Sequence, residues 1–243
     1  MHRKGKTVAR LIGVCLGWLV LVLPAHAGPW PRDPGQTFLA LSGEGDRAGN
    51  SYLGLYGEYG LSRRRVLGAE LGHTDVGETT LLLWYQKSLD DGEGPYRLSY
   101  SVGLGAIRRN GEIQPLSQAG LMLGRGLAGP WDGGWMTAEA RLKVAGKTEE
   151  MTVRDGLTQV EYAYLTPEIV GKLDLTLGIR PRPDWAIVNQ LRLERGKDSD
   201  FQAKLVSSVV YDIAGPARLE AGVIAPLSGP GEVGFKLGTW FEF

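Results

Sequence analysis

Apolar and polar residues alternate along most of the chain. In the final stretch, VGFKLGTWFEF, the residues Val233, Phe235, Leu237, Phe241 and Phe243 share one parity, and mostly small or charged residues separate them. A period of two predicts a β-strand, because successive side chains of a strand point to opposite faces. Twelve segments follow this period: residues 37–44, 51–60, 64–74, 79–89, 96–107, 115–126, 135–146, 161–180, 185–196, 201–213, 217–227 and 232–243.

The predicted strands are long, and no helical period separates them. Most have about ten residues or more, which is the length that a tilted strand needs to cross a bilayer. The longest, residues 161–180, either stands above the membrane, bends at Pro167 or divides in two near Gly171. The pattern therefore predicts an all-β fold, a transmembrane antiparallel up-and-down β-barrel of about 12 strands, with 10 or 14 as alternatives.

Each predicted strand has one apolar and one charged face. In residues 135–146, Met136 and Leu142 lie on the apolar face, and Glu139 and Arg141 lie on the other. A soluble β-sandwich shows the same stripes, with its apolar face turned inward. Aromatic residues near the strand ends favour the membrane barrel, because such rings collect at the level of the lipid headgroups. They include Trp84, Tyr96, Trp185, Tyr211 and Trp240.

Two connections stand out between the predicted strands. The stretch GKTEEMTVRDGLTQ, residues 146–159, is predicted as the longest and most polar loop. Arg108 and Arg109 are predicted in the loop that follows residues 96–107. Most other connections are short and contain Gly, Pro or Asp, as tight turns require.

The N-terminus has the features of a secretory signal peptide. A basic stretch, MHRKGKTVAR, precedes a short apolar run and the sequence AHA, which predicts cleavage after Ala27. Residues 28–243 are then a single domain. Cleavage removes four of the 27 Lys and Arg residues and leaves 23 against 27 Asp and Glu, so nothing suggests a nucleic-acid partner. It also removes Cys15, the one Cys, and leaves His73 as the last His.

The last strand resembles the closing strand of Gram-negative outer-membrane β-barrel proteins. Members of that family commonly end in an alternating strand with a C-terminal Phe, here Phe243, which the barrel assembly machinery recognises. The resemblance implies a cell outer-membrane location, with both termini on the periplasmic side. It also implies periplasmic chaperones, the barrel assembly machinery, outer-membrane lipid and lipopolysaccharide as partners.

Charged residues of both signs fall on the face predicted to line the barrel lumen. A cation on the lipid face costs roughly 2–4 kcal/mol at the bilayer midplane, so these residues are expected inside. We predict either a small passive channel for small polar solutes or a structural barrel plugged by ion pairs. No cofactor and no metal site is predicted. The proposed lumen-lining residues are Glu139, Arg141, Lys143, Glu168, Lys172, Arg192, Glu194, Lys204, Arg218 and Glu220.

The alternative function is a lipid-modifying enzyme at the extracellular rim, of the phospholipase or lipid A deacylase type. His73 is predicted on the lipid face near a strand end, Asp75 shares that face, and Ser51 comes close if residues 51–60 and 64–74 form a hairpin. A Ser–His–Asp set supports nucleophilic catalysis. The sequence LGHTD lacks the His-x-Ser spacing of those enzyme families, so the passive barrel is the preferred interpretation.

Overall fold

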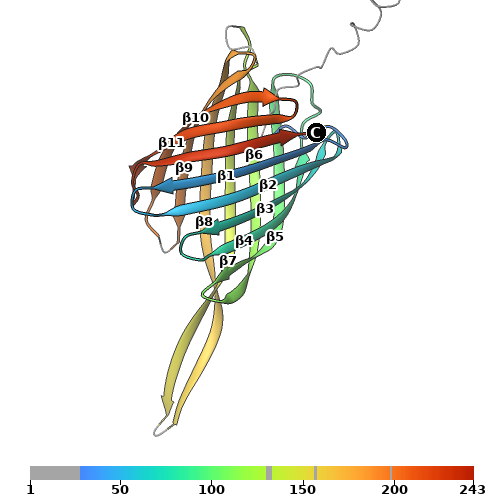
Figure 1. Cartoon of the computed structure of the whole chain (residues 1–243). Coiled ribbons are helices and arrows are strands. Elements are labelled where there is room, and N and C mark those ends of the chain that lie inside the picture. The colour runs from blue at the N-terminus through green and yellow to red at the C-terminus, as the bar shows by residue number, and fades with distance from the viewer. Residues whose placement is uncertain (1–27, 130–132, 156–157, 198) are drawn as a thin grey trace, which may run out of the picture.

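The computed structural model describes residues 28–129, 133–155, 158–197 and 199–243, so the predicted signal peptide lies outside the described residues. Twelve strands form one closed antiparallel barrel, which confirms the predicted fold class and excludes 10 or 14 strands (Figure 1). The strands are β1 (Thr37–Asp46), β2 (Ser51–Ser62), β3 (Arg65–Thr74), β4 (Thr79–Ser88), β5 (Tyr96–Arg109), β6 (Glu112–Gly126), β7 (Trp135–Asp155), β8 (Thr158–Arg182), β9 (Trp185–Gly196), β10 (Gln202–Ala214), β11 (Ala217–Ser228) and β12 (Gly234–Glu242).

The barrel closes where β1 pairs with β12. The register runs from Phe38 opposite Glu242 to Asp46 opposite Gly234. At the end of this pairing, the backbones of Thr37 and Phe243 exchange two hydrogen bonds of 3.0 and 2.9 Å. Every strand therefore has two neighbours, which removes the exposed edges that an open sheet would present.

The two faces of the wall differ in polarity, as the alternation predicted. Leu41, Leu53 and Leu104 point outward, where between half and three quarters of each residue's surface is exposed. Phe38 and Leu82 point into the barrel and are buried. An apolar outer wall fits lipid, because the hydrocarbon core offers no partner for polar groups. Among the described residues, no helix is long and apolar enough to cross a membrane.

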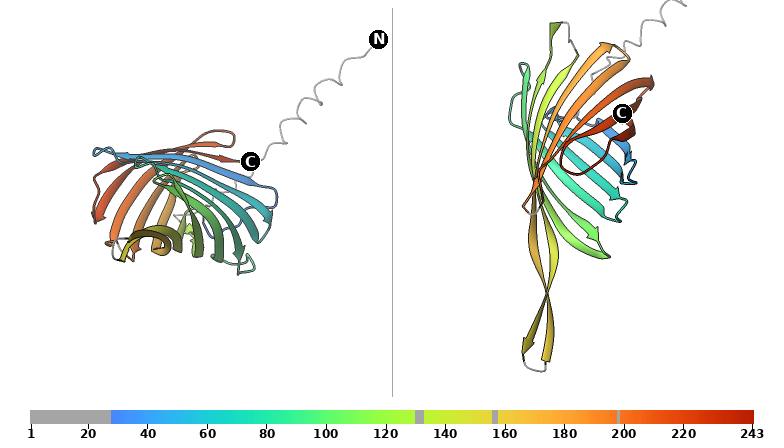
Figure 2. Two further views of the ribbon diagram at one scale, coloured as in Figure 1. Left: turned by 90° about the horizontal axis from the view of Figure 1, so that it is seen from below. Right: turned by 90° about the vertical axis from the view of Figure 1, so that its left-hand side faces the viewer.

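β7 and β8 continue beyond the barrel as a two-stranded ribbon (Figures 1 and 2). The predicted loop at residues 146–159 is therefore wrong: Lys147 to Asp155 pair in register with Thr166 to Thr158. β8 neither bends away at Pro167 nor divides at Gly171. Pro167 pairs with β7, but its other side has no strand partner, because β9 joins β8 only from Val170 onward. A proline, which lacks an N–H, is tolerated at such a free strand edge.

The hairpin between β5 and β6 also differs from the prediction. Arg108 and Arg109 belong to β5 rather than to a loop, and the turn consists of Asn110 and Gly111. Both turn residues have positive φ, 50° and 86°. Asn-Gly adopts this backbone readily in a two-residue hairpin turn, so the strands extend further than their apolar stripe indicates.

Candidate functional site: the barrel lumen

The two ends of the lumen differ and are called the ribbon end and the terminal end. The ribbon end is the end from which the β7–β8 ribbon projects, and the terminal end holds Thr37 and the C-terminus (Figure 1). Each end holds buried or half-buried ion pairs, but their surroundings differ.

Two ion pairs cross the lumen between strands that are not neighbours in the sheet. Arg192 on β9 places Nη1 2.9 Å from Glu44 Oε1 on β1. Lys143 on β7 places Nζ 3.9 Å from Glu70 Oε1 on β3. Each contact spans the lumen, so the passage is narrow at both places. The cations have opposing acids at hand, and this lowers the cost of holding their charges inside the wall.

Other predicted lumen residues pair along the wall. Arg141 forms ion pairs with Asp174 and with Glu139, the latter at 3.5 Å. Lys172 and Glu194 pair at 2.6 Å. These pairs join adjacent strands or residues two apart on one strand, and therefore they stiffen the wall without crossing the lumen.

The remaining predicted residues lie nearer the two ends. Glu220 on β11 accepts from Lys236 at 2.8 Å and from Trp240 Nε1 at 3.0 Å. Glu168 pairs with Arg109 beside the ribbon. Lys204 has no ion-pair partner among the described residues, although it lines a cavity described below.

One side of the lumen is filled by apolar side chains. Val66, Leu82, Trp84, Ile107 and Leu116 are buried together on β3 to β6. Trp84 lies against Gly68, where a Cβ would collide with the indole ring. The open part of the lumen is therefore confined to the opposite, charged side.

A polar cavity of about 270 Å³ occupies the ribbon end of the lumen. Tyr52, Asn50 and Gln202 contribute uncharged polar groups to its lining. Three cations and four acids surround it, so it has no strong excess of one charge. These charged residues are Glu44, Asp46, Lys172, Arg192, Glu194, Lys204 and Glu232.

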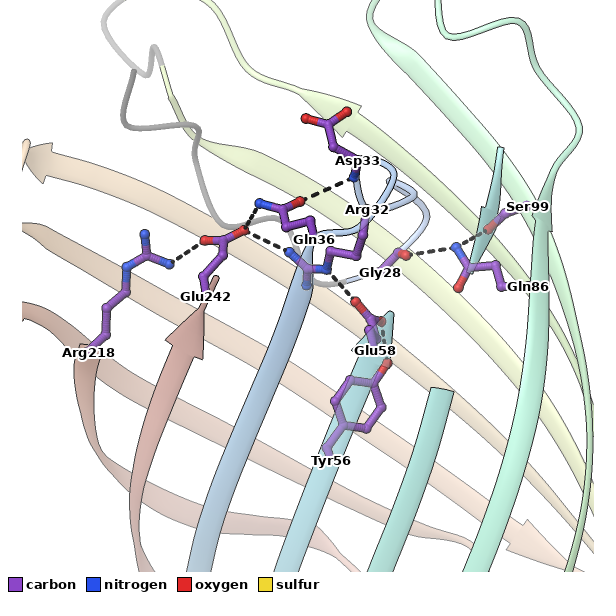
Figure 3. A network of polar contacts seen from close by, with 10 residues as sticks. All are labelled: Gly28, Arg32, Asp33, Gln36, Tyr56, Glu58, Gln86, Ser99, Arg218 and Glu242. Carbon is purple, nitrogen blue, oxygen red and sulfur yellow. Dashed lines mark hydrogen bonds and ion pairs between the residues drawn. The ribbon is translucent and has the colours of Figure 1, made fainter. Parts of the chain in front are cut away.

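The terminal end is covered by residues 28–36, called the N-terminal segment (Figure 3). Arg32 reaches into the barrel, with Nε 2.5 Å from Glu58 Oε2 on β2 and Nη1 3.2 Å from Glu242 Oε1 on β12. Gln36 Nε2 and Arg218 Nη1 also donate to Glu242, at 3.0 and 3.2 Å. One carboxylate thus joins the N-terminal segment to the last two strands.

The first residues of the N-terminal segment are seated on the inner wall. Gln86 Nε2 donates to the carbonyl oxygen of Gly28 at 3.1 Å and to Ser99 Oγ at 3.2 Å (Figure 3). Trp30 packs against a buried cluster that contains Trp135, Ala186 and Val210. The sequence pattern assigned no role to this segment, because it precedes the first alternating stripe and has no period of its own.

The predicted enzyme residues are near one another, but their contacts do not form a relay. His73 Nδ1 lies 2.9 Å from Thr79 Oγ1. Ser51 contacts Asp75 through its backbone and not through its hydroxyl: the Ser51 N–H donates to Asp75 Oδ1, and the Asp75 N–H donates to the Ser51 carbonyl oxygen, each at 3.1 Å. Between described residues, no hydrogen bond connects His73 to Ser51 or to Asp75. The geometry therefore provides no support for a catalytic triad.

Phe243, the predicted assembly signal, lies at the barrel seam. Its ring is exposed and stacks on Phe241, with ring centroids 6.4 Å apart. In the described part of the chain, no three or more His, Cys, Asp or Glu residues are grouped so as to hold a metal ion.

Comparison with protein-family models and with curated protein sequences finds no match. Solved structures do match. The NanC porin in a rhombohedral crystal form has a TM-score of 0.57 at 10% identity, over 84% of this chain and 98% of that chain. The KdgM porin has a TM-score of 0.55 at 7% identity, over 85% and 99%. KdgM in complex with disordered oligogalacturonate has a TM-score of 0.53 at 8% identity, over 85% and 99%. At these identities the likeness shows the fold: this chain has the barrel architecture of these porins.

Proposed function

We propose that the chain is an outer-membrane channel for small polar solutes. The observation that carries the proposal is the lumen: a closed barrel with an apolar exterior encloses a polar cavity of about 270 Å³ lined by charges of both signs. A charged interior inside an apolar wall is the arrangement by which barrels conduct water and solutes. The porin-like fold supports the same function.

The cellular setting belongs to the same proposal. Residues 1–27 direct export and are removed, residues 28–243 form the mature domain, and the barrel machinery recognises Phe243 with help from periplasmic chaperones. Lipid and lipopolysaccharide surround the barrel. With both termini on the periplasmic side, the ribbon end faces outward and the terminal end faces the periplasm.

The charge of the lumen limits the class of solute. One porin of similar fold was solved with an oligogalacturonate, a polyanion. In the present chain Glu44 and Glu194 sit beside Arg192 and Lys172, so the cavity has no uninterrupted cationic track. We expect weak ion selectivity and a preference for small solutes with little net charge.

Single-channel recording in planar bilayers tests this function. We expect small conductance steps with similar permeability to cations and anions. Arg192→Ala should raise the conductance by removing a side chain that crosses the lumen, and it should favour cations because Glu44 loses its partner. Because the N-terminal segment covers the terminal end, a variant lacking residues 29–34 is recorded as well. Silence of all three proteins at every voltage would leave only a structural barrel.

A further inference from the structure

The N-terminal segment is the one part of the described inner surface that does not belong to the barrel wall. Its sequence, GPWPRDPGQ, contains Pro29, Pro31 and Pro34. Proline has no N–H to donate, so half of residues 29–34 cannot donate a backbone hydrogen bond to a strand ladder. Side chains, rather than ladder pairing, must therefore hold these residues in the lumen.

The wall is shaped to receive the N-terminal segment. A Cβ at Gly124 on β6 would collide with the Pro29 ring and would lie 2.7 Å from the Trp30 ring. A Cβ at Gly60 on β2 would collide with the carbonyl oxygen of Asp33. Glycine at both places permits the close approach. Pro29 is buried in this seat.

Arg32 is the principal polar attachment of the N-terminal segment. Its side chain is only 4% exposed, and Glu58 and Glu242 hold it from opposite sides of the barrel seam. The Nη2 atom is buried and has no hydrogen-bond partner. One donor group of the guanidinium is therefore unsatisfied, and the attachment depends on the two carboxylates.

The barrel does not need the N-terminal segment for closure. β1 begins at Thr37, and its backbone pairing at the seam with β12 and Phe243 involves residues 37–46, none of which belongs to the N-terminal segment. Gly35 precedes the strand with φ of +84°, a backbone region open to glycine, and its N–H bonds to the Gly60 carbonyl oxygen at 2.8 Å. Residues 29–34 can thus leave the lumen about this hinge while every strand keeps its two neighbours.

We propose that residues 29–34 form a releasable gate over the terminal end of the lumen, with Arg32 as its latch. The gate rests on the proposed channel function. When it is docked, the segment narrows the passage and Arg32 neutralises Glu58 and Glu242. When it leaves, the passage widens and the two carboxylates face water without Arg32, so the open mouth favours cations. Arg32 thereby sets both the opening and the ion preference of this end.

A disulfide lock tests the gate directly. A Cβ at Gly124 would collide with the Pro29 ring, and Pro29→Cys removes that ring, so a small shift of Trp30 makes room for the second cysteine. Paired cysteines need Cβ atoms about 3.5–4.5 Å apart, and Pro29→Cys with Gly124→Cys brings two thiols within reach. The only natural cysteine, Cys15, lies in the predicted signal peptide. The oxidised double variant should show lower conductance and fewer openings than the same protein after reduction. The Pro29→Cys single variant, which cannot form the bond, should not respond to the reductant.

Deletion of residues 29–34 is the complementary test. The deleted protein should conduct more than the wild type, and its reversal potential in a salt gradient should shift toward cations. Heat-modifiable migration in gels verifies that the barrel is folded. Equal conductance and selectivity in the wild type, the locked variant and the deletion would overturn the gate and leave the channel standing. If none of these proteins conducts, the channel and the gate both fail.

Discussion

The two ends of the lumen contain the same kind of ion pair in different surroundings. At the terminal end, the side chains of Arg32 and Glu58 are 4% and 3% exposed. At the ribbon end, those of Arg192 and Glu44 are 30% and 19% exposed and face a cavity of about 270 Å³. Water screens the second pair and is excluded from the first. Both pairs join an arginine to a glutamate. Their different burial therefore explains why the first pair fixes the N-terminal segment and the second lines the polar cavity.

The largest effect is expected for Arg32→Ala. Breaking a buried pair by removing one partner costs about 3–5 kcal/mol, because the remaining carboxylate is uncompensated. The N-terminal segment can undock and wet Glu58, so the loss should appear as release of the segment rather than as unfolding of the barrel. Hydrogen–deuterium exchange of residues 28–36 should rise on the order of a hundredfold or more, since about 1.4 kcal/mol corresponds to a factor of ten.

The control for Arg32→Ala is Arg63→Ala. Arg63 is exposed on the turn between β2 and β3, at the same end of the barrel. The Arg63→Ala substitution removes an equal charge without breaking a buried ion pair, so hydrogen–deuterium exchange in the N-terminal segment should stay at the wild-type rate. Similar exchange in both variants would show that Arg32 is not the latch.

Gly124→Val should have a smaller effect at the same end. The new side chain occupies the seat of Pro29, and overpacking of a filled site costs typically about 1–3 kcal/mol. Gly126→Val is the matched control, because it lies two residues further along β6 and a Cβ there has no neighbour within 4 Å. Exchange of residues 28–36 should increase in the first variant only. An equal increase in both would mean that the N-terminal segment is not seated against Gly124.

Arg192→Ala should change the stability of the barrel little. Solvent-exposed ion pairs contribute about 0–1 kcal/mol. The Arg192–Glu44 pair is partly buried, but it faces the polar cavity, so its contribution should be close to that range. The midpoint temperature of heat-induced unfolding, followed by the change in gel mobility, should therefore shift by no more than a few degrees. The ion preference of the channel should change as described above. Lys204→Ala removes the same charge from the cavity without breaking an ion pair and should leave the midpoint in place. A large loss of stability in Arg192→Ala would show that the ribbon end is as tightly coupled as the terminal end.

The smallest effect is expected for shortening the ribbon. Residues 147–155 and 158–166 pair with each other, and β6 and β9 pair with β7 and β8 only from Ala145 and Val170 inward. Replacing residues 149–164 by a short turn should leave heat-modifiable migration and single-channel conductance unchanged. A change in conductance would show that the ribbon reaches the lumen.

The period of the sequence predicts the barrel and the inward-facing residues, but it cannot predict contacts across the lumen. Alternation places Arg192 and Glu44 on the inner face, because parity is a local property of each strand. Their contact depends on two strands, β9 and β1, that are far apart in the sheet and face each other across the lumen. The sequence contains no local signal for that geometry.

Three further features are not predicted from the sequence, each for a physical reason. The β7–β8 ribbon reads as a loop because its residues are polar, yet mutual backbone pairing suffices to extend both strands. The N-terminal segment has three prolines and no alternation, so its role depends on Gly60 and Gly124, which lie far away in the sequence. The sequence predicts Arg109 in a loop, but the Asn110-Gly111 turn extends β5, and Arg109 Nε lies 2.7 Å from Glu78 Oε1.

The difference between the two ends is tested most directly by cysteine accessibility. Glu194→Cys places a thiol in the cavity at the ribbon end, and Ser99→Cys places one at a fully buried position beside Gln86 and the N-terminal segment. A charged, water-soluble thiol reagent should modify Glu194→Cys rapidly and Ser99→Cys slowly. Deletion of residues 29–34 should accelerate only the second reaction. Equal rates at the two positions in the intact protein would contradict a lumen that is wet at the ribbon end and whose wall is covered by the N-terminal segment at the terminal end.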